Sequence, residues 1–333
     1  MELLVLGGTR HVGRAVVEEG LARGDAVTTL NRGLGRTAEG VEALVADRTE
    51  PGAVRAAVGG REWDAVIDTW SGAPRVVAES GAALAGRAGH YGYVSSRSVH
   101  RWPMAPGANE GAPVVDGDPD DAADTDYAAA KRGGELAALR AFGDRALLAR
   151  AGLILGPYEV IGRMPWWLRR VERGGRVLAP GDPGRPLQYI DARDLARWML
   201  DAAERGVGGA FNTVSRRGHA TMGGLLATAI AVTGSDAELV WAPEDVIAAA
   251  GIQPWTELPI WLPRDAEYDG MHDGDVSAAY AEGLTCRPVR ETVADTWAWL
   301  RFEGDPPPRP GKPALGLDPA VEQHVLATLG AGA

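Results

Sequence analysis

The fold of this chain is decided by Glu2-Leu-Leu-Val-Leu6 and the residues that follow, Gly7-Gly8-Thr9-Arg10-His11-Val12-Gly13. The apolar run predicts a strand, and apolar residues from Val12 to Leu21 then recur at helical spacing. Glycines in the turn let the backbone approach a pyrophosphate with no Cβ in the way, and the helix N-terminus offers unpaired N–H groups to the anion. A purely structural glycine turn is the alternative. The pattern favours dinucleotide binding, through Gly7, Gly8, Thr9, Arg10, His11 and Val12.

Alternating strands and helices continue through the first half of the chain. The strand candidates are Ala26–Leu30, Ala43–Ala46, Ala65–Asp68 and Tyr91–Ser95, and residues 73–88 have helical spacing. Residues 105–126, rich in Pro, Gly and Asp, predict a solvated loop. This alternation predicts an α/β fold with a Rossmann-type, doubly wound parallel sheet whose ligands bind at the carboxyl ends of the strands.

Lysine is nearly absent, because Lys131 and Lys312 are the only two among 34 basic residues. Lys131 follows Tyr127 by four residues, about one helical turn, so the phenol and the ammonium share one helix face. A cation beside a phenol lowers the phenol's pKa, so Tyr127 is a candidate proton donor or acceptor. An exposed helical Tyr/Lys pair is the alternative.

Composition narrows the class of protein. A chain of 333 residues that is 45% hydrophobic can bury a sizeable core as one large or two small domains. The single cysteine, Cys286, excludes an intramolecular disulfide and a CxxC metal site, and no spacing of histidines and carboxylates predicts a metal. We expect a cytoplasmic protein, since the first apolar run is too short for a signal peptide and no stretch is long enough to span a membrane. The net charge of −11 disfavours nucleic acid as a partner.

The chain resembles the extended or atypical short-chain dehydrogenase/reductases, the NAD(P)-dependent epimerase/dehydratase-like family. The resemblance extends over nearly the whole chain. Its marks are the glycine turn, Tyr93-Val-Ser-Ser96, Tyr127 with Lys131 and Glu135, Arg150 to Pro157, Tyr189-Ile-Asp-Ala-Arg-Asp194, and Arg287-Pro-Val-Arg-Glu-Thr292 before Trp297.

The resemblance implies a catalytic set of Ser96, Tyr127 and Lys131, with Ser95 as the second choice for the serine. Tyr127 would exchange a proton with the substrate oxygen, Ser96 would hydrogen-bond that oxygen, and Lys131 would lower the pKa of Tyr127 and hold the nicotinamide ribose. The other reading of Ser96 is a strand-end hydroxyl that caps the next turn.

Residues after the second strand bear on the choice of cofactor. Asn31 and Arg32 stand where NAD-specific folds place an acidic residue, with Arg36 nearby, so we expect NADP(H) to be preferred over NAD(H). A solvated arginine in a loop is an equally good reading of Arg32. By family resemblance the adenine contacts are Asp47 and Arg48, and the residues that border the cofactor at the next strand end are Thr69, Trp70 and Ser71.

The resemblance also implies the domain organisation. Residues 1–157 would form the dinucleotide-binding domain, to which about 188–212 return, and 158–187 with 213–333 would form a smaller substrate-binding domain. Candidate substrate contacts besides Ser96 are His100, Trp166 and Trp167, although a hydrogen-bonded histidine and core tryptophans are the simpler readings. Asp318 and Pro319 predict the N-cap and first turn of a terminal helix. Partners would be a small-molecule substrate and a second copy in a homodimer.

The favoured function is that of an NAD(P)-dependent oxidoreductase acting on a carbonyl or secondary alcohol of a small molecule. Arg10 replaces the middle glycine of the usual spacing, and Arg97 stands where family dehydratases carry acidic residues. Leu153 and Leu187 occupy places where nucleotide-sugar enzymes carry polar anchors for a diphosphate. A nucleotide-sugar 4-epimerase is the alternative among enzymes, and a non-catalytic NAD(P)-binding scaffold is the alternative outside them.

Overall fold

The first strand lies at the centre of the main sheet. In the computed structural model, which describes residues 1–123, 126–309, 311 and 313–331, β1 (Glu2–Leu6) pairs in parallel with β2 (Ala26–Asn31) and with β4 (Trp63–Asp68). Leu3 to Leu6 are completely buried. A strand with neighbours on both edges and helices on both faces has no side in water, which is why this run is continuously apolar rather than alternating.

The main sheet has seven parallel strands in the order β11-β6-β5-β4-β1-β2-β3. The remaining members are β3 (Glu42–Val45), β5 (Ala88–Ser96), β6 (Ala146–Ala151) and β11 (Gly209–Thr213). The strands run outward from β1 in both directions, so the chain reverses its strand order between β1 and β4. This is the doubly wound, Rossmann-type α/β arrangement, and the predicted fold class is confirmed.

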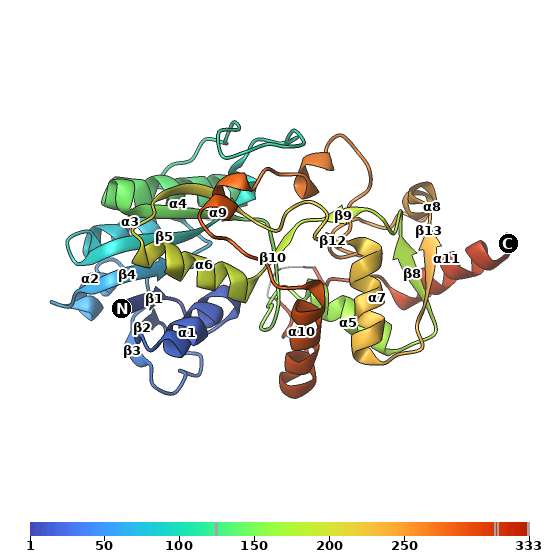
Figure 1. The fold of residues 1–333 in the computed structure, drawn as a ribbon, viewed down its shortest axis with the longest axis horizontal. Coiled ribbons are helices and arrows are strands. Elements are labelled where there is room, and N and C mark those ends of the chain that lie inside the picture. The colour runs from blue at the N-terminus through green and yellow to red at the C-terminus, as the bar shows by residue number, and fades with distance from the viewer. Residues whose placement is uncertain (124–125, 310, 312, 332–333) are drawn as a thin grey trace. The chain divides into compact units, whose positions relative to one another are not determined.

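Helices cover both faces of this sheet. α3 packs against α4 on one face and α1 against α6 on the other (Figure 1). The helices of this part are α1 (His11–Arg23), α2 (Ala53–Val58), α3 (Pro74–Leu84), α4 (Tyr127–Phe142), α6 (Ala192–Glu204) and α9 (Ser277–Ala281). The helix predicted over 73–88 ends early because the Arg87 N–H turns back to the Leu84 carbonyl ahead of β5. Residues 105–123 form no helix or strand, only an isolated bridge at Val114, while residues 124–125 of the predicted loop lie outside the described residues.

The chain divides into two units. Unit 1 comprises residues 1–152, 192–214 and 274–286, and unit 2 comprises 153–191, 215–273 and 287–333. The sequence predicted one return to the first unit, near 188–212, whereas the structure has a second return at 274–286. Asp275 ties this return to unit 1 by donating its N–H to Ala108 O at 3.0 Å and by accepting the Asn212 amide on its carbonyl at 3.1 Å. The segment contains only the short helix α9 and no strand, so no sheet position was predicted for it.

Unit 2 is a helical layer with three two-stranded sheets around its own apolar core. The sheets pair β7 (Leu153–Leu155) with β10 (Tyr189–Asp191), β8 (Arg176–Pro180) with β13 (Glu238–Ala242), and β9 (Pro186–Leu187) with β12 (Ala220–Thr221). The helices are α5 (Arg163–Glu172), α7 (Met222–Thr233), α8 (Glu244–Ala249), α10 (Val289–Glu303) and α11 (Pro319–Ala331). Asp318 caps α11 by accepting the Ala320 N–H at 2.7 Å, which confirms the predicted N-cap. Across the described residues no helix is both long and apolar enough to span a membrane.

Candidate functional site

The turn after β1 has a backbone that only glycine fits. Gly7 has φ +123° and Gly8 has φ +96°, both in the region that L side chains avoid. A Cβ at Gly7 would lie 2.5 Å from the Thr69 hydroxyl, and one at Gly8 would lie 2.7 Å from a methyl group of Thr29. The turn is therefore packed directly against the ends of the neighbouring strands.

The helix that follows the turn is also held close to it. A Cβ at Gly13 would lie 2.7 Å from the backbone nitrogen of Gly8, so the third glycine sets the distance between α1 and the turn. Arg10 is the N-cap residue of α1, and its side chain makes no capping hydrogen bond. The first N–H groups of α1 are thus left without a side-chain cap, as an anion site at a helix N-terminus requires.

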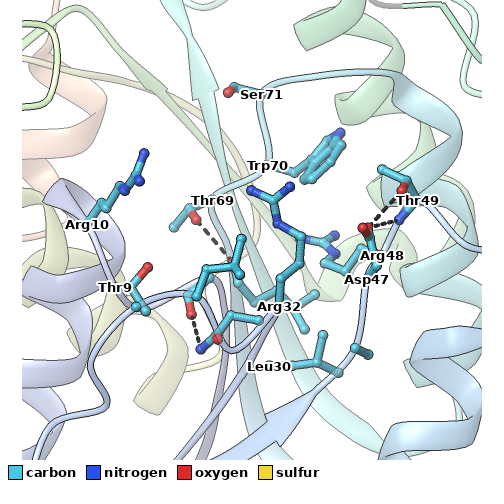
Figure 2. Close-up of a pocket in the computed structure, with 16 residues that line it drawn as sticks. Thr9, Arg10, Leu30, Arg32, Asp47, Arg48, Thr49, Thr69, Trp70 and Ser71 are labelled. Atoms are coloured by element: carbon cyan, nitrogen blue, oxygen red, sulfur yellow. Dashed lines mark hydrogen bonds between the residues drawn. The ribbon is translucent and has the colours of Figure 1, made fainter. Parts of the chain in front are cut away.

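A pocket of about 350 Å³ lies at the carboxyl ends of β1, β2, β3 and β4 (Figure 2). Ten residues expected to contact a cofactor line it: Gly7, Thr9, Arg10, Asn31, Arg32, Asp47, Arg48, Thr69, Trp70 and Ser71. Gly8, His11 and Val12 belong to the same turn and helix but do not line the pocket. The lining residues that the sequence analysis missed are Leu6, Leu30, Leu34, Gly35, Ala46 and Thr49. No motif in the sequence predicts these six residues, and only their positions close to the ends of strands could have indicated them.

Two exposed arginines border the pocket. Arg10 and Arg32 are exposed, and neither guanidinium forms a hydrogen bond or salt bridge with the residues that the structure describes. Figure 2 shows both side chains extending away from the backbone in the same general direction. Asn31 at the end of β2 accepts the Gly33 N–H at 2.8 Å, so it shapes the loop that presents Arg32. Hydrogen bonds from Thr49 lower the pKa of Asp47, and the charge of Arg32 lowers it further, so an anion interacts with Arg32 in the same pocket.

Arg48 lines the pocket, but the structure commits its guanidinium elsewhere. Its two terminal nitrogens each lie 2.7 Å from a carboxylate oxygen of Asp68, and Ser80 Oγ accepts two further bonds at 3.0 and 3.2 Å. The guanidinium also lies 5.2 Å from the centre of the Trp70 ring. The guanidinium of Arg48 is therefore a buried support under the pocket, while the residue itself lines the pocket and its contact with an adenine stays a prediction.

The end of β5 separates the two serine candidates. Ser95 donates its hydroxyl to Glu135 Oε1 at 2.8 Å and is buried in that contact. Ser96 accepts the Ser98 N–H at 3.1 Å, so it does cap the short 3₁₀ turn Arg97–Val99. This capping bond uses an acceptor position of the hydroxyl and leaves its proton available to a ligand. Of the two serines, Ser96 is the one whose hydroxyl keeps that capacity.

Tyr127 and Lys131 lie on the first turns of α4. Asp126 caps this helix by accepting the Ala129 N–H at 2.7 Å, so Tyr127 is the first helical residue, and its side chain is half exposed. Lys131 is buried, and its Nζ donates to Trp70 O at 2.6 Å and Val94 O at 2.7 Å. Burial lowers the pKa of Lys131 to about 8, partly offset by the charges of Asp68 and Glu135. Because Lys131 is buried, the alternative reading of Tyr127 and Lys131 as an exposed helical pair is wrong.

The candidate substrate contacts differ in accessibility. His100 is fully buried, and its Nε2 lies 3.2 Å from Asn212 Oδ1 inside unit 1. Trp167 is fully buried in the core of unit 2, where its indole donates to Pro259 O at 2.6 Å. Trp166 is partly buried and packs edge-on against Trp167 with ring centres 4.6 Å apart. Neither His100 nor Trp167 presents surface to a ligand, which corrects the prediction that they contact a substrate, while Trp166 stays a prediction.

Comparison with known proteins identifies the family and the fold. A model of the NAD dependent epimerase/dehydratase family matches residues 3–213. No curated protein matches the chain significantly. Two similar solved structures are WbmH of Bordetella bronchiseptica in complex with NAD+ (17% identity, 91% of this chain and 99% of that chain, TM-score 0.68) and UDP-glucose 4-epimerase of Thermotoga maritima with UDP-glucose (18% identity, 91% and 99%, TM-score 0.65). A third is UDP-N-acetylglucosamine 4-epimerase of Methanobrevibacter ruminantium with UDP-N-acetylmuramic acid (16% identity, 91% and 98%, TM-score 0.65). At these identities the likeness establishes the shared fold alone.

The residues of the pocket fit the dinucleotide that the family description names. The turn forms a cradle that a Cβ at Gly7 or Gly8 would fill, next to a helix N-terminus without a side-chain cap. Arg10 and Arg32 add two exposed positive charges, neither of which forms a salt bridge with the described residues. These features match the needs of a ligand with a central pyrophosphate and a ribose at the end of the second strand.

Proposed function

Because this chain belongs to the NAD dependent epimerase/dehydratase family, we propose that it is an enzyme that transfers a hydride between a nicotinamide cofactor and a carbonyl or secondary-alcohol carbon of a small molecule. The observation that carries the proposal is the buried Lys131 ammonium, bonded to the carbonyls of Trp70 and Val94, on the helix that begins at Tyr127. Lysines usually serve as solvated surface charges, and a buried lysine in a chain with only two lysines does not have that role.

Each residue of the set has a separate role. A bound nicotinamide dinucleotide supplies the hydride donor or acceptor. Tyr127 gives a proton to the substrate oxygen or takes one from it, and Ser96 donates a hydrogen bond to that oxygen. Lys131 supplies positive charge that favours the deprotonated Tyr127 and binds the ribose next to the nicotinamide. The glycine turn and the first turn of α1 hold the pyrophosphate.

We further propose that NADP(H) is preferred over NAD(H). Arg32 brings an exposed positive charge to the pocket, and Asn31 stands where an acidic residue would repel a 2′-phosphate. The solved relative WbmH was crystallised with NAD+, so the two cofactors must be compared directly. Calorimetric titration with NADPH and NADH makes this comparison, and equal or tighter binding of NADH would refute the preference.

A nucleotide-sugar 4-epimerase is the second candidate, because 4-epimerases are among the structures with this fold. The burial of Leu153 and Leu187 favours the reductase instead. Both leucines lie in the apolar core of unit 2, at the places where nucleotide-sugar enzymes carry polar anchors for a diphosphate. A diphosphate without charged partners would be costly to bind. We therefore place net oxidation or reduction of a small carbonyl compound ahead of epimerisation.

Three measurements separate the candidates. A reductase oxidises NAD(P)H stoichiometrically when screened against small carbonyl compounds, and it binds no UDP-, GDP- or dTDP-sugar. Submillimolar binding of a nucleotide sugar without net cofactor oxidation would support the epimerase instead. Tight NAD(P)(H) binding with neither sugar binding nor turnover would leave the non-catalytic scaffold.

Variants at two tyrosines test the proton-transfer role. Tyr127→Phe should lower turnover by roughly 10²-fold or more with little change in cofactor affinity, since it removes only the proton. Lys131→Ala should lower both the turnover and the cofactor affinity. Tyr93→Phe is the matched control, because the Tyr93 hydroxyl is buried with no hydrogen-bond partner among the described residues. Equal turnover in Tyr127→Phe and the native protein would disprove the assignment.

A further inference from the structure

The Lys131 ammonium is bonded to two carbonyl groups that belong to different segments. Trp70 O lies in the loop after β4, and Val94 O lies near the end of β5. The position of the ammonium is therefore set by whatever fixes these two peptides. In both segments a buried carboxylate bonds either the residue itself or its neighbour, and in β5 it does so beside the sheet pairing of Val94 with Ala149.

Asp68 fixes the first segment. The last residue of β4, it accepts the Trp70 N–H on Oδ1 at 2.9 Å and the Tyr91 hydroxyl on Oδ2 at 2.6 Å. Trp70 thus bonds Asp68 through its nitrogen and Lys131 through its carbonyl. Any shift of the carboxylate would move the residue that holds the ammonium.

Glu135 fixes the second segment. It lies one helical turn after Lys131 on α4 and accepts the Ser95 hydroxyl at 2.8 Å. Ser95 directly follows Val94, whose carbonyl accepts from Lys131. The side chains of Lys131 and Glu135 therefore fasten α4 to the end of β5 at two consecutive residues, next to Ser96.

Each carboxylate has a buried arginine as its partner. Arg48 makes a bidentate pair with Asp68, and Arg150 bonds both oxygens of Glu135 at 2.8 and 3.0 Å. Burial by itself would raise the pKa of each carboxyl group, but the arginines outweigh it and both pKa values are lowered. Both groups are therefore anionic at neutral pH, although neither is exposed to solvent.

We propose that Asp68 and Glu135 are positioning residues for Lys131. Asp68 bonds the N–H of Trp70, whose carbonyl binds the ammonium, Glu135 bonds the side chain that follows the second carbonyl, and together they keep the ammonium charged. The role of Lys131 in catalysis rests on the proposed function, but its position and charge do not. The charged or titratable groups that the structure places against it are Asp68 from β4, Tyr93 from β5 with its ring centre 4.8 Å from Nζ, and Glu135 from α4. Arg48 pairs with Asp68, and both Arg150 and Arg132 pair with Glu135.

A purely structural role for the two ion pairs predicts the opposite shift in the pKa of Lys131 when one of the carboxylates is removed. Breaking a buried ion pair is destabilising, and a loosened site would admit water to Lys131. Hydration would move the pKa of Lys131 up, toward the ordinary lysine value of about 10.4. Loss of a nearby anion from an intact site would move it down, because the charged form loses a stabilising partner.

The near absence of lysine allows this pKa to be measured directly. Protein grown with lysine labelled with ¹³C at Cε shows two lysine signals, from Lys131 and Lys312, and Lys312→Arg assigns them. We expect the native Lys131 signal to titrate well below an ordinary lysine. Asp68→Asn and Glu135→Gln should each lower that midpoint further, by about one pH unit or more. Asp120→Asn is the control, since it removes an exposed carboxylate that bonds Arg140 of the same helix bidentately, and it should change nothing.

An unchanged or raised Lys131 midpoint in either folded variant would overturn the proposal. If a single variant does not fold, Arg48→Met with Asp68→Asn, or Arg150→Met with Glu135→Gln, removes the buried arginine together with its carboxylate. Arg132, which also bonds Glu135 at 2.8 Å, is partly exposed and can be solvated in the second double variant. We expect the same downward shift of the Lys131 midpoint in these double variants. The titration needs no substrate, so a failure of the proposed function, such as no turnover with any carbonyl compound, leaves this result interpretable.

Discussion

Replacing Gly8 by alanine should damage cofactor binding far more than replacing Gly24 by alanine. Both glycines have positive φ, +96° and +80°, so both substitutions carry a backbone strain of about 1 kcal/mol. They differ in their surroundings. A Cβ at Gly8 meets Thr29 at 2.7 Å and Val17 at 3.2 Å, whereas nothing lies within 4 Å of a Cβ at Gly24.

The magnitude follows from these contacts. Overpacking adds about 1–3 kcal/mol at Gly8, and the turn must move by several tenths of an ångström to relieve it. Such a shift misaligns backbone N–H groups aimed at a pyrophosphate, and each charge-assisted hydrogen bond lost costs about 1.5–3 kcal/mol. NADPH affinity should therefore fall by about 10- to 100-fold in Gly8→Ala. In Gly24→Ala it should stay within about twofold of native, since the helix C-cap is remote from the pocket lining.

Fluorescence titration with NADPH measures the loss of affinity in each variant, and thermal unfolding of the free proteins measures the loss of stability. Gly24→Ala should lose a few degrees of Tm at native affinity. If Gly8→Ala binds NADPH as tightly as the native protein does, the turn does not hold the pyrophosphate. Equal losses of affinity in the two variants would show that backbone strain, and not the contact with Thr29, governs binding.

Three further predictions concern other parts of the molecule. Arg32→Ala should weaken NADPH binding by about 10-fold or more and leave NADH binding nearly unchanged, because only the 2′-phosphate meets the guanidinium; Arg36→Ala, outside the pocket lining, is the control in the same calorimetric titration. Trp167→Ala should lower the free energy of unfolding by about 3–5 kcal/mol in urea titrations, more than Trp166→Ala, because only Trp167 is fully buried and bonded to Pro259. The folded pKa of Glu135 lies below its unfolded value of 4.5, so its contribution to stability is full above that pH and is lost as pH falls through the folded pKa. Below pH 4.5 the unfolding free energy of Glu135→Gln should accordingly decline less steeply than that of the native protein, and parallel slopes would contradict the assigned ion pair.

The sequence alone determined the sheet and which residues gather at the pocket after β1, because both depend on short-range features. The run Leu3 to Leu6 is continuously apolar, as in a strand covered on both faces, and its end is marked by two glycines with positive φ. Strand ends on the same edge of a parallel sheet converge, so Asn31, Asp47 and Thr69 could be expected at one pocket from their positions alone. The Tyr127 and Lys131 pair needed only the period of a helix.

The tertiary structure alone decided how the charged and polar side chains are used. It placed the guanidinium of Arg48 on Asp68, the hydroxyl of Ser95 on Glu135, and His100 and Trp167 in the cores of their units. It also revealed the second return of the chain, at residues 274–286. The pairs Arg48–Asp68 and Ser95–Glu135 join residues 20 and 40 positions apart. No local period encodes such partners, because a buried charge takes whichever group the packing of separate elements brings within hydrogen-bonding distance.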